Sequence, residues 1–175
     1  MQRIAIDLCL AAIIGFSAFT AVKSYKIDTS KAKVTFNIVN MGLTVEGAFD
    51  GARGAVYFDE NNLAGSRIEA SVDASTINTG IGMRDDHLRE PDYFDVEKYP
   101  RISFQSTSIE RSGNGYKATG KFTIRDVTKT VTVPFTFSNG TFKGDFSIKR
   151  TDYGVGESSW VMKDKVKIFF EIPVL

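Results

Sequence analysis

The sequence predicts an all-β protein: a single domain of antiparallel strands with one short helical insert. Apolar and polar residues alternate with a period of two in successive runs, which is typical of strands that bury one face. The chain has 14 Phe and 6 Tyr but one Trp, and aromatic side chains favour strands because they pack well on a half-buried pleated surface. Its 175 residues are enough for one domain with a packed core.

Eight predicted strands follow one another along the chain. They occupy residues 34–39, 45–49, 55–58, 68–74, 116–124, 131–137, 142–148 and 166–174. Short segments rich in Asn, Gly and Ser, at 61–62, 112–115 and 138–140, separate several of these runs. Such segments reverse the chain within a few residues, so neighbouring strands are predicted to be antiparallel.

Eight antiparallel strands with one apolar face each form either a two-sheet sandwich or a barrel. Small residues such as Ala70, Ala118 and Gly144 lie on the apolar faces. In a sandwich they would be covered by large side chains of the facing sheet. In a barrel of about eight strands they would leave room for one small ligand. The alternation alone leaves both architectures open.

Residues 80–100 interrupt the alternation with a highly charged segment that contains the only histidine, His87. Asp85 stands four residues before Arg89, the spacing of an ion pair on one helix face. Pro91 suits the first turn of a second short helix. We therefore expect two short helices packed over one end of the β-structure.

A catalytic reading of this segment rests on His87, which has Asp85, Asp86 and Glu90 nearby and could act as a general base. No second histidine, nucleophilic cysteine in the domain or G-x-S-x-G turn accompanies it. One histidine with loosely spaced carboxylates also lacks recognisable metal-ligand spacing. The sequence therefore predicts neither a catalytic nor a metal site, and an enzyme that uses His87 remains the alternative.

The first 24 residues have the layout of a secretory signal peptide. Arg3 provides a basic start, residues 8–19 form an apolar run of 12 residues, and Val22 and Ser24 are suitable for positions −3 and −1 of a cleavage site. A retained membrane anchor is the alternative, but Asp7 and the short run argue against it. We expect cleavage after Ser24, a mature domain of residues 25–175, and a periplasmic or secreted location.

The charge balance and the cysteine content restrict the expected partners and the source of stability. Cleavage would remove two of the 22 basic and one of the 21 acidic residues, which leaves 20 of each. This balance gives no electrostatic reason to expect nucleic acid as a partner. The only cysteine, Cys9, would leave with the leader. An exported domain without disulfides must then be stabilised by its packed core.

Three segments of the chain form a longer pattern. They read Arg84-Asp85-x-His87-Leu88-Arg89 with Asp92-Tyr93-Phe94-Asp95-Val96 and Tyr99-Pro100-x-Ile102-x-Phe104, then Phe122-Thr123-Ile124 with Val127-Thr128-Lys129, then Arg150-x-Asp152-Tyr153-Gly154. In this order, behind a leader, they closely resemble the YceI-like family of bacterial polyisoprenoid-binding, lipocalin-like proteins. The resemblance spans essentially the whole mature chain.

This resemblance implies an eight-stranded antiparallel lipocalin-like barrel with the helical insert near its mouth. It further implies that a tunnel holds a polyisoprenoid, an isoprenoid quinone or another long-chain lipid, for transport, storage or stress protection. We expect no other cofactor and no enzymatic activity. Two alternatives remain: an enzyme that acts on a barrel-bound lipid through His87, and an interaction module with a filled core. Transient membrane contact and a homodimer are compatible with this reading.

The inward faces of the strands supply the expected tunnel lining. These residues are Phe36, Ile38, Phe49, Val72, Phe104, Phe122, Val133, Phe135, Phe146, Ile168 and Phe170. The expected mouth and lid residues are Met83, Arg84, His87, Leu88, Arg89, Tyr93 and Phe94. Among these, Arg84, His87 and Arg89 are the expected donors to a polar head group.

Overall fold

The computed structural model describes residues 22–175, so the predicted leader lies almost entirely outside the described residues. The strands are β1 (Ser24–Lys26), β2 (Lys33–Asn40), β3 (Leu43–Phe49), β4 (Arg53–Tyr57), β5 (Arg67–Asp73), β6 (Arg101–Ser112), β7 (Gly115–Ile124), β8 (Val127–Ser138), β9 (Thr141–Lys149) and β10 (Met162–Pro173). One α-helix, α1 (Gly82–Arg89), and three 3₁₀ turns, η1 (Leu63–Gly65), η2 (Ala74–Thr76) and η3 (Arg150–Tyr153), complete the elements.

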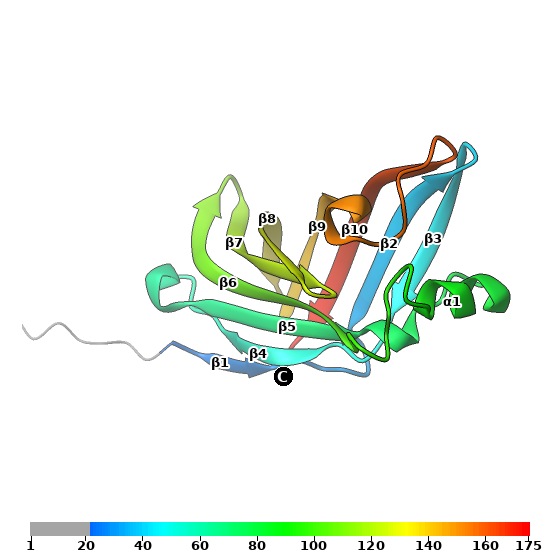
Figure 1. The fold of residues 1–175 in the computed structure, drawn as a ribbon. Coiled ribbons are helices and arrows are strands. Elements are labelled where there is room, and N and C mark those ends of the chain that lie inside the picture. The colour runs from blue at the N-terminus through cyan, green and yellow to red at the C-terminus, as the bar shows by residue number, and fades with distance from the viewer. Residues whose placement is uncertain (1–21) are drawn as a thin grey trace, which may run out of the picture.

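The ten strands form one antiparallel sheet in the order β1-β4-β5-β6-β7-β8-β9-β10-β2-β3, and Figure 1 shows that it curls strongly. Within residues 22–175 the two edge strands, β1 and β3, do not pair with each other. Isolated bridges instead join Ile27 to Val174 and Ala48 to Asn78. The curl is therefore an incompletely closed barrel, and the predicted all-β antiparallel class with a helical insert is confirmed.

The predicted count of eight strands is wrong, because β1 and β6 were not among the predicted runs. β6 pairs with both β5 and β7, but its register shifts between Ser106 and Ser108. A bulge of this kind breaks the period-two alternation on which the prediction depended. β1 has only three residues, too few to show a period.

The insert contains one helix rather than two. After α1, residues 91–99 form successive turns, and Asp95 adopts a left-handed backbone conformation with φ 47°. The amides of Lys98 and Tyr99 both donate to the Asp95 carbonyl. A left-handed residue cannot continue a right-handed helix, so the helix predicted from Pro91 does not form.

The interior divides into two apolar clusters. In one, Phe58 is 1% exposed and lies 5.1 Å from Tyr116, 5.8 Å from Phe135 and 5.3 Å from Phe142 between ring centroids. These edge-to-face contacts are a favourable aromatic geometry. The second cluster includes Phe49, and the insert packs against it. Aromatic rings thus fill one end of the curl.

Candidate ligand-binding site

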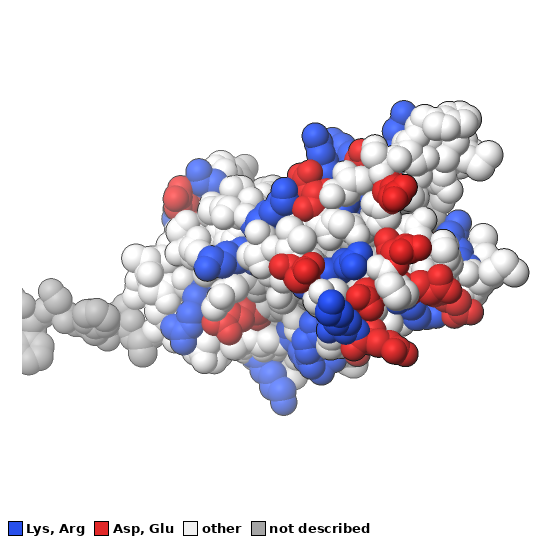
Figure 2. Space-filling model, viewed as in Figure 1, with Lys and Arg blue, Asp and Glu red and all other residues white. Residues whose placement is uncertain are grey.

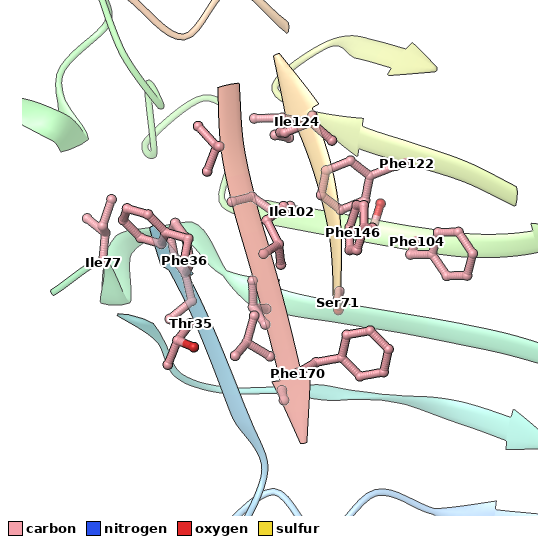
Figure 3. A pocket seen from close by; sticks show the side chains of 18 of the residues that line it. Thr35, Phe36, Ser71, Ile77, Ile102, Phe104, Phe122, Ile124, Phe146 and Phe170 are labelled. Carbon is pink, nitrogen blue, oxygen red and sulfur yellow. The ribbon is translucent and has the colours of Figure 1, made fainter. Parts of the chain in front are cut away.

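The curled sheet encloses a cavity of about 250 Å³. In Figure 3 the labelled side chains that line it come from β2, β5, β6, β7, β9 and β10 and from the segment after β5, and nearly all of their atoms are carbon. Phe135 and Phe142, which contact Phe58, belong to both the lining and the aromatic cluster. The filled end therefore forms the floor of the cavity.

The structure brings together all but one of the predicted tunnel residues. The residues that line the cavity are Phe36, Ile38, Phe49, Val72, Phe104, Phe122, Phe135, Phe146, Ile168 and Phe170. Val133 is also buried, at 6% exposure, but it does not line the cavity; its ladder partner is Ala118 of β7. The alternation identified the buried face of each strand but not which part of that face borders empty space.

The predicted mouth residues divide into two groups. Arg84, Leu88, Tyr93 and Phe94 line the cavity. Met83, His87 and Arg89 do not; Met83 is 85% exposed. The insert therefore presents one face to the cavity and the other to solvent.

His87 and Arg89 lie outside the cavity lining and have protein partners of their own. The His87 ring forms a 3.0 Å hydrogen bond with Glu90 and packs edge-on against Tyr93. Arg89 donates to the Ser75 and Ile77 carbonyls at 2.8 and 2.9 Å. Arg89 thus fastens α1 to the segment after β5.

The predicted ion pair between Asp85 and Arg89 is wrong, since Arg89 pairs with Asp86 at 2.7 Å. Asp85 is 6% exposed and accepts hydrogen bonds from the backbone amide and the hydroxyl of Thr79. Arg84 donates to the Thr79 hydroxyl at 2.7 Å and to the Thr79 carbonyl at 2.8 Å. Thr79 and Arg84 both line the cavity, so this network provides polar groups at the insert side.

Two arginines outside the insert hold the loop after β9. Arg150 is buried, lines the cavity, and donates to the carbonyls of Val155 and Glu157 and to the carboxylate of Asp164. Arg125 donates to the carbonyls of Tyr93 and Gly154, at 3.0 and 2.6 Å. Arg125 therefore connects the insert to the loop that Arg150 fixes.

The sequence analysis missed several further lining residues. Some extend inward faces already recognised, including Val34, Ile68, Ile102, Phe142, Ile148, Val166 and Ile172. Others, including Thr35, Ser71, Ser103 and Ile77, gave no signal, and Arg150 was part of the family pattern but was not expected in the lining. Strand twist and tertiary packing bring these residues to the cavity. Among residues 22–175, no group of three His, Cys, Asp or Glu is placed to hold a metal ion. In the same range no helix has the length and apolarity to span a bilayer.

A curled antiparallel sheet around an apolar cavity, filled at one end and bordered by a helical insert, defines a barrel protein that can enclose an apolar small molecule. The model of the YceI-like domain matches residues 25–174, and the chain belongs to that family. Protein YceI of Escherichia coli O17:K52:H18 (strain UMN026 / ExPEC) is 31% identical over 169 residues, covering 89% of this chain and 88% of the relative.

Solved structures share the fold. BcnA of Burkholderia cenocepacia has a TM-score of 0.79 and 35% identity, over 85% of this chain and 99% of BcnA. A domain from Saccharophagus degradans, described as polyisoprenoid binding and implicated in plant cell wall breakdown, has a TM-score of 0.65 over 89% of this chain and 98% of its own. At 14% identity the second likeness shows the fold alone.

Proposed function

We propose that this protein binds the apolar chain of a polyisoprenoid, an isoprenoid quinone or another long-chain lipid inside its cavity. The observation that carries the proposal is the carbon-lined cavity inside a chain of the YceI-like family. The polyisoprenoid-binding description of the Saccharophagus degradans domain supports the same ligand class. A cavity of this kind also argues against the alternative of a fully packed interaction module.

The cavity volume sets how much of such a lipid is enclosed. An apolar cavity of roughly 150 Å³ accepts benzene, so by proportion about 250 Å³ accommodates about ten carbons. At about 0.8 kcal/mol per buried CH₂, ten carbons contribute about 8 kcal/mol, which corresponds to roughly micromolar binding before ordering costs. A longer chain must displace lining side chains or extend out through the mouth. The Thr79–Arg84 network would then lie within reach of its polar end.

We propose binding rather than catalysis. His87, on which the enzyme alternative depends, lies outside the cavity lining and is hydrogen-bonded to Glu90. A general base must reach the proton that it removes. A ligand in the cavity would have no such contact with His87 in this arrangement.

Export, carriage of lipid between membranes, storage and stress protection are parts of the same proposal. Residues 1–24 would be the cleaved leader, and transient membrane contact would be the step that loads the lipid. N-terminal sequencing of the periplasmic protein tests export: Tyr25 as the first residue supports it, and an intact Met1 contradicts it. A homodimer is compatible with the proposal, and sedimentation would test for one.

Solvent extraction of the purified protein followed by mass spectrometry tests the ligand class. The proposal expects a long-chain lipid in near-stoichiometric amount. An extract without lipid, together with no saturable uptake of an added polyprenol or quinone, would contradict the proposal. Protein denatured before incubation with the same lipid controls for nonspecific adsorption.

A further inference from the structure

The large apolar side chains that remain exposed are concentrated at a few positions. Within residues 22–175 they are Met41, Leu43, Ile81, Met83, Trp160 and Leu175. Single exposed apolar residues are ordinary, but adjacent ones mark contact surfaces. Met41, Leu43 and Trp160 belong to two segments that adjoin each other, and we refer to these three residues as the apolar tip.

Backbone pairing brings the three residues of the apolar tip together. Asn40 pairs with Leu43 across the β2–β3 turn and with Met162 at the start of β10. The Met41 amide donates to the Val161 carbonyl at 2.8 Å, which places Trp160 one residue from this contact. Figure 1 shows the β2–β3 turn and the loop before β10 side by side at the upper right.

The backbone conformation of Met41 indicates that the folding of the turn does not explain why a methionine occupies this position. Met41 and Gly42 form a two-residue turn with φ values of 51° and 78°, and such turns strongly favour Asn-Gly. At the other end of β10, the β8–β9 turn uses that pair: Asn139 and Gly140 have φ values of 49° and 68°. Methionine is disfavoured in the left-handed region, and here it is also 76% exposed. A residue that adopts a disfavoured backbone conformation and also exposes an apolar side chain is a candidate for function.

The apolar tip lies at the rim of the cavity. Asn40 and Met162, the residues adjacent to the β2–β3 turn and to the loop before β10, both line the cavity. On the insert side Arg84 of α1 lines it as well, and its neighbour Met83 is exposed. Figure 1 shows α1 and the turn projecting towards the same side. In Figure 2 the projection at the turn is mostly uncharged.

We propose that the apolar tip inserts into the acyl chains of a lipid bilayer and holds the cavity mouth against the membrane. The inference rests on the proposed function, because contact with the bilayer would give the lipid a route into the cavity that does not cross water. Exposed tryptophan suits the membrane interface, and the face of the projection seen in Figure 2 is mostly white, with few basic side chains that would favour anionic lipid in particular. The partner is therefore a neutral bilayer rather than a protein or a second copy of this chain.

Trp160 is the only tryptophan of the chain and is 90% exposed, so its fluorescence reports directly on the apolar tip. The purified protein is mixed with phosphatidylcholine vesicles, with and without bromine on the acyl chains. The proposal expects a blue shift of the emission and quenching by the brominated chains. Unchanged emission at saturating vesicle concentration would overturn it. A blue shift that grows with protein concentration in the absence of vesicles would indicate self-association and would also overturn it.

Matched variants separate the apolar tip from general apolar exposure. Met41→Asn installs the residue that the turn favours, so it should keep or raise the melting temperature while weakening vesicle binding about fivefold to tenfold. Leu175→Asn removes a similarly exposed residue at the other end of the barrel and should leave vesicle binding unchanged. Equal vesicle binding by wild type and Met41→Asn would contradict the proposal.

A second readout distinguishes failure of the apolar tip from failure of the proposed function. Met41→Asn should take up a short isoprenol dispersed in buffer as well as wild type does, because the cavity is unchanged. If wild type takes up no isoprenol, the proposed function fails. If isoprenol uptake is normal while Trp160 is not quenched by brominated chains, the membrane inference alone fails.

Discussion

The Asp85 carboxylate accepts two hydrogen bonds from Thr79, one from its backbone amide and one from its hydroxyl. Asp85 belongs to α1, and Thr79 lies on the segment that follows β5 and borders the cavity. A buried carboxylate is stable in the fold only when its oxygens are hydrogen-bonded. This pair therefore fixes the helix at the mouth.

Asp85→Ala should destabilise the protein by about 2 kcal/mol, because it leaves the Thr79 amide without its acceptor. Denaturant unfolding measures the change. Asp86→Ala is the matched control: its carboxylate is exposed and forms a surface ion pair with Arg89, so a loss of less than about 1 kcal/mol is expected. Equal losses in the two variants would contradict the role given to Asp85.

Arg125→Lys should loosen the connection between the insert and the loop after β9. Arg125 donates from one nitrogen to the carbonyls of Tyr93 and Gly154, and a lysine ammonium lacks the rigid planar geometry that aims such bonds. Hydrogen exchange should become faster in residues 91–99 and 150–156 and stay unchanged in β7. Unchanged exchange in both segments would show that Arg125 does not hold them.

The way in which the free energy of unfolding changes at acidic pH should depend on Ser75. The hydrogen bonds that Ser75 donates to the Asp73 carboxylate lower the pKa of Asp73 below its usual value of 3.8. Both folded and unfolded chains carry an ionised Asp73 well above pH 3.8, where the stabilisation is complete. Below that pH the unfolded chain binds the proton first, so the contribution is lost as the pH falls through the lowered pKa.

Ser75→Ala should therefore lower the free energy of unfolding by less than about 1 kcal/mol near neutral pH, since the pair is partly open to solvent. The difference from wild type should shrink as the pH is lowered from neutral through the lowered pKa of Asp73. Ser75→Thr keeps the hydroxyl and should behave as wild type. If the difference in the free energy of unfolding between Ser75→Ala and wild type stayed constant over this pH range, the hydrogen bond from Ser75 to Asp73 would not be its cause.

The sequence predicted those parts of the site that local periodicity determines. Phe36, Phe122 and Phe170 were placed on inward faces because side chains alternate along a strand, and they line the cavity. Val133 fits the same pattern and lies outside the lining. The difference depends on where the sheet curls, which is a property of the whole sheet rather than of one strand.

Tertiary contacts determine what the sequence left out. Arg150 reaches the cavity because the loop after β9 folds back over it, and four carbonyl groups of residues 155, 157, 162 and 163 satisfy its donors together with Asp164. Asp85 was paired with Arg89 on spacing alone, but Thr79 is the partner that the fold supplies. No local pattern encodes either contact.

One pair of identical substitutions tests the central claim that the cavity encloses an apolar chain. Val72 and Val133 are both buried strand residues, but only Val72 lines the cavity. After delipidation, wild type, Val72→Phe and Val133→Phe are titrated with a defined isoprenol, and circular dichroism checks that each is folded. The account predicts a clearly reduced capacity for Val72→Phe and near-normal capacity for Val133→Phe. Undiminished uptake by folded Val72→Phe would contradict it.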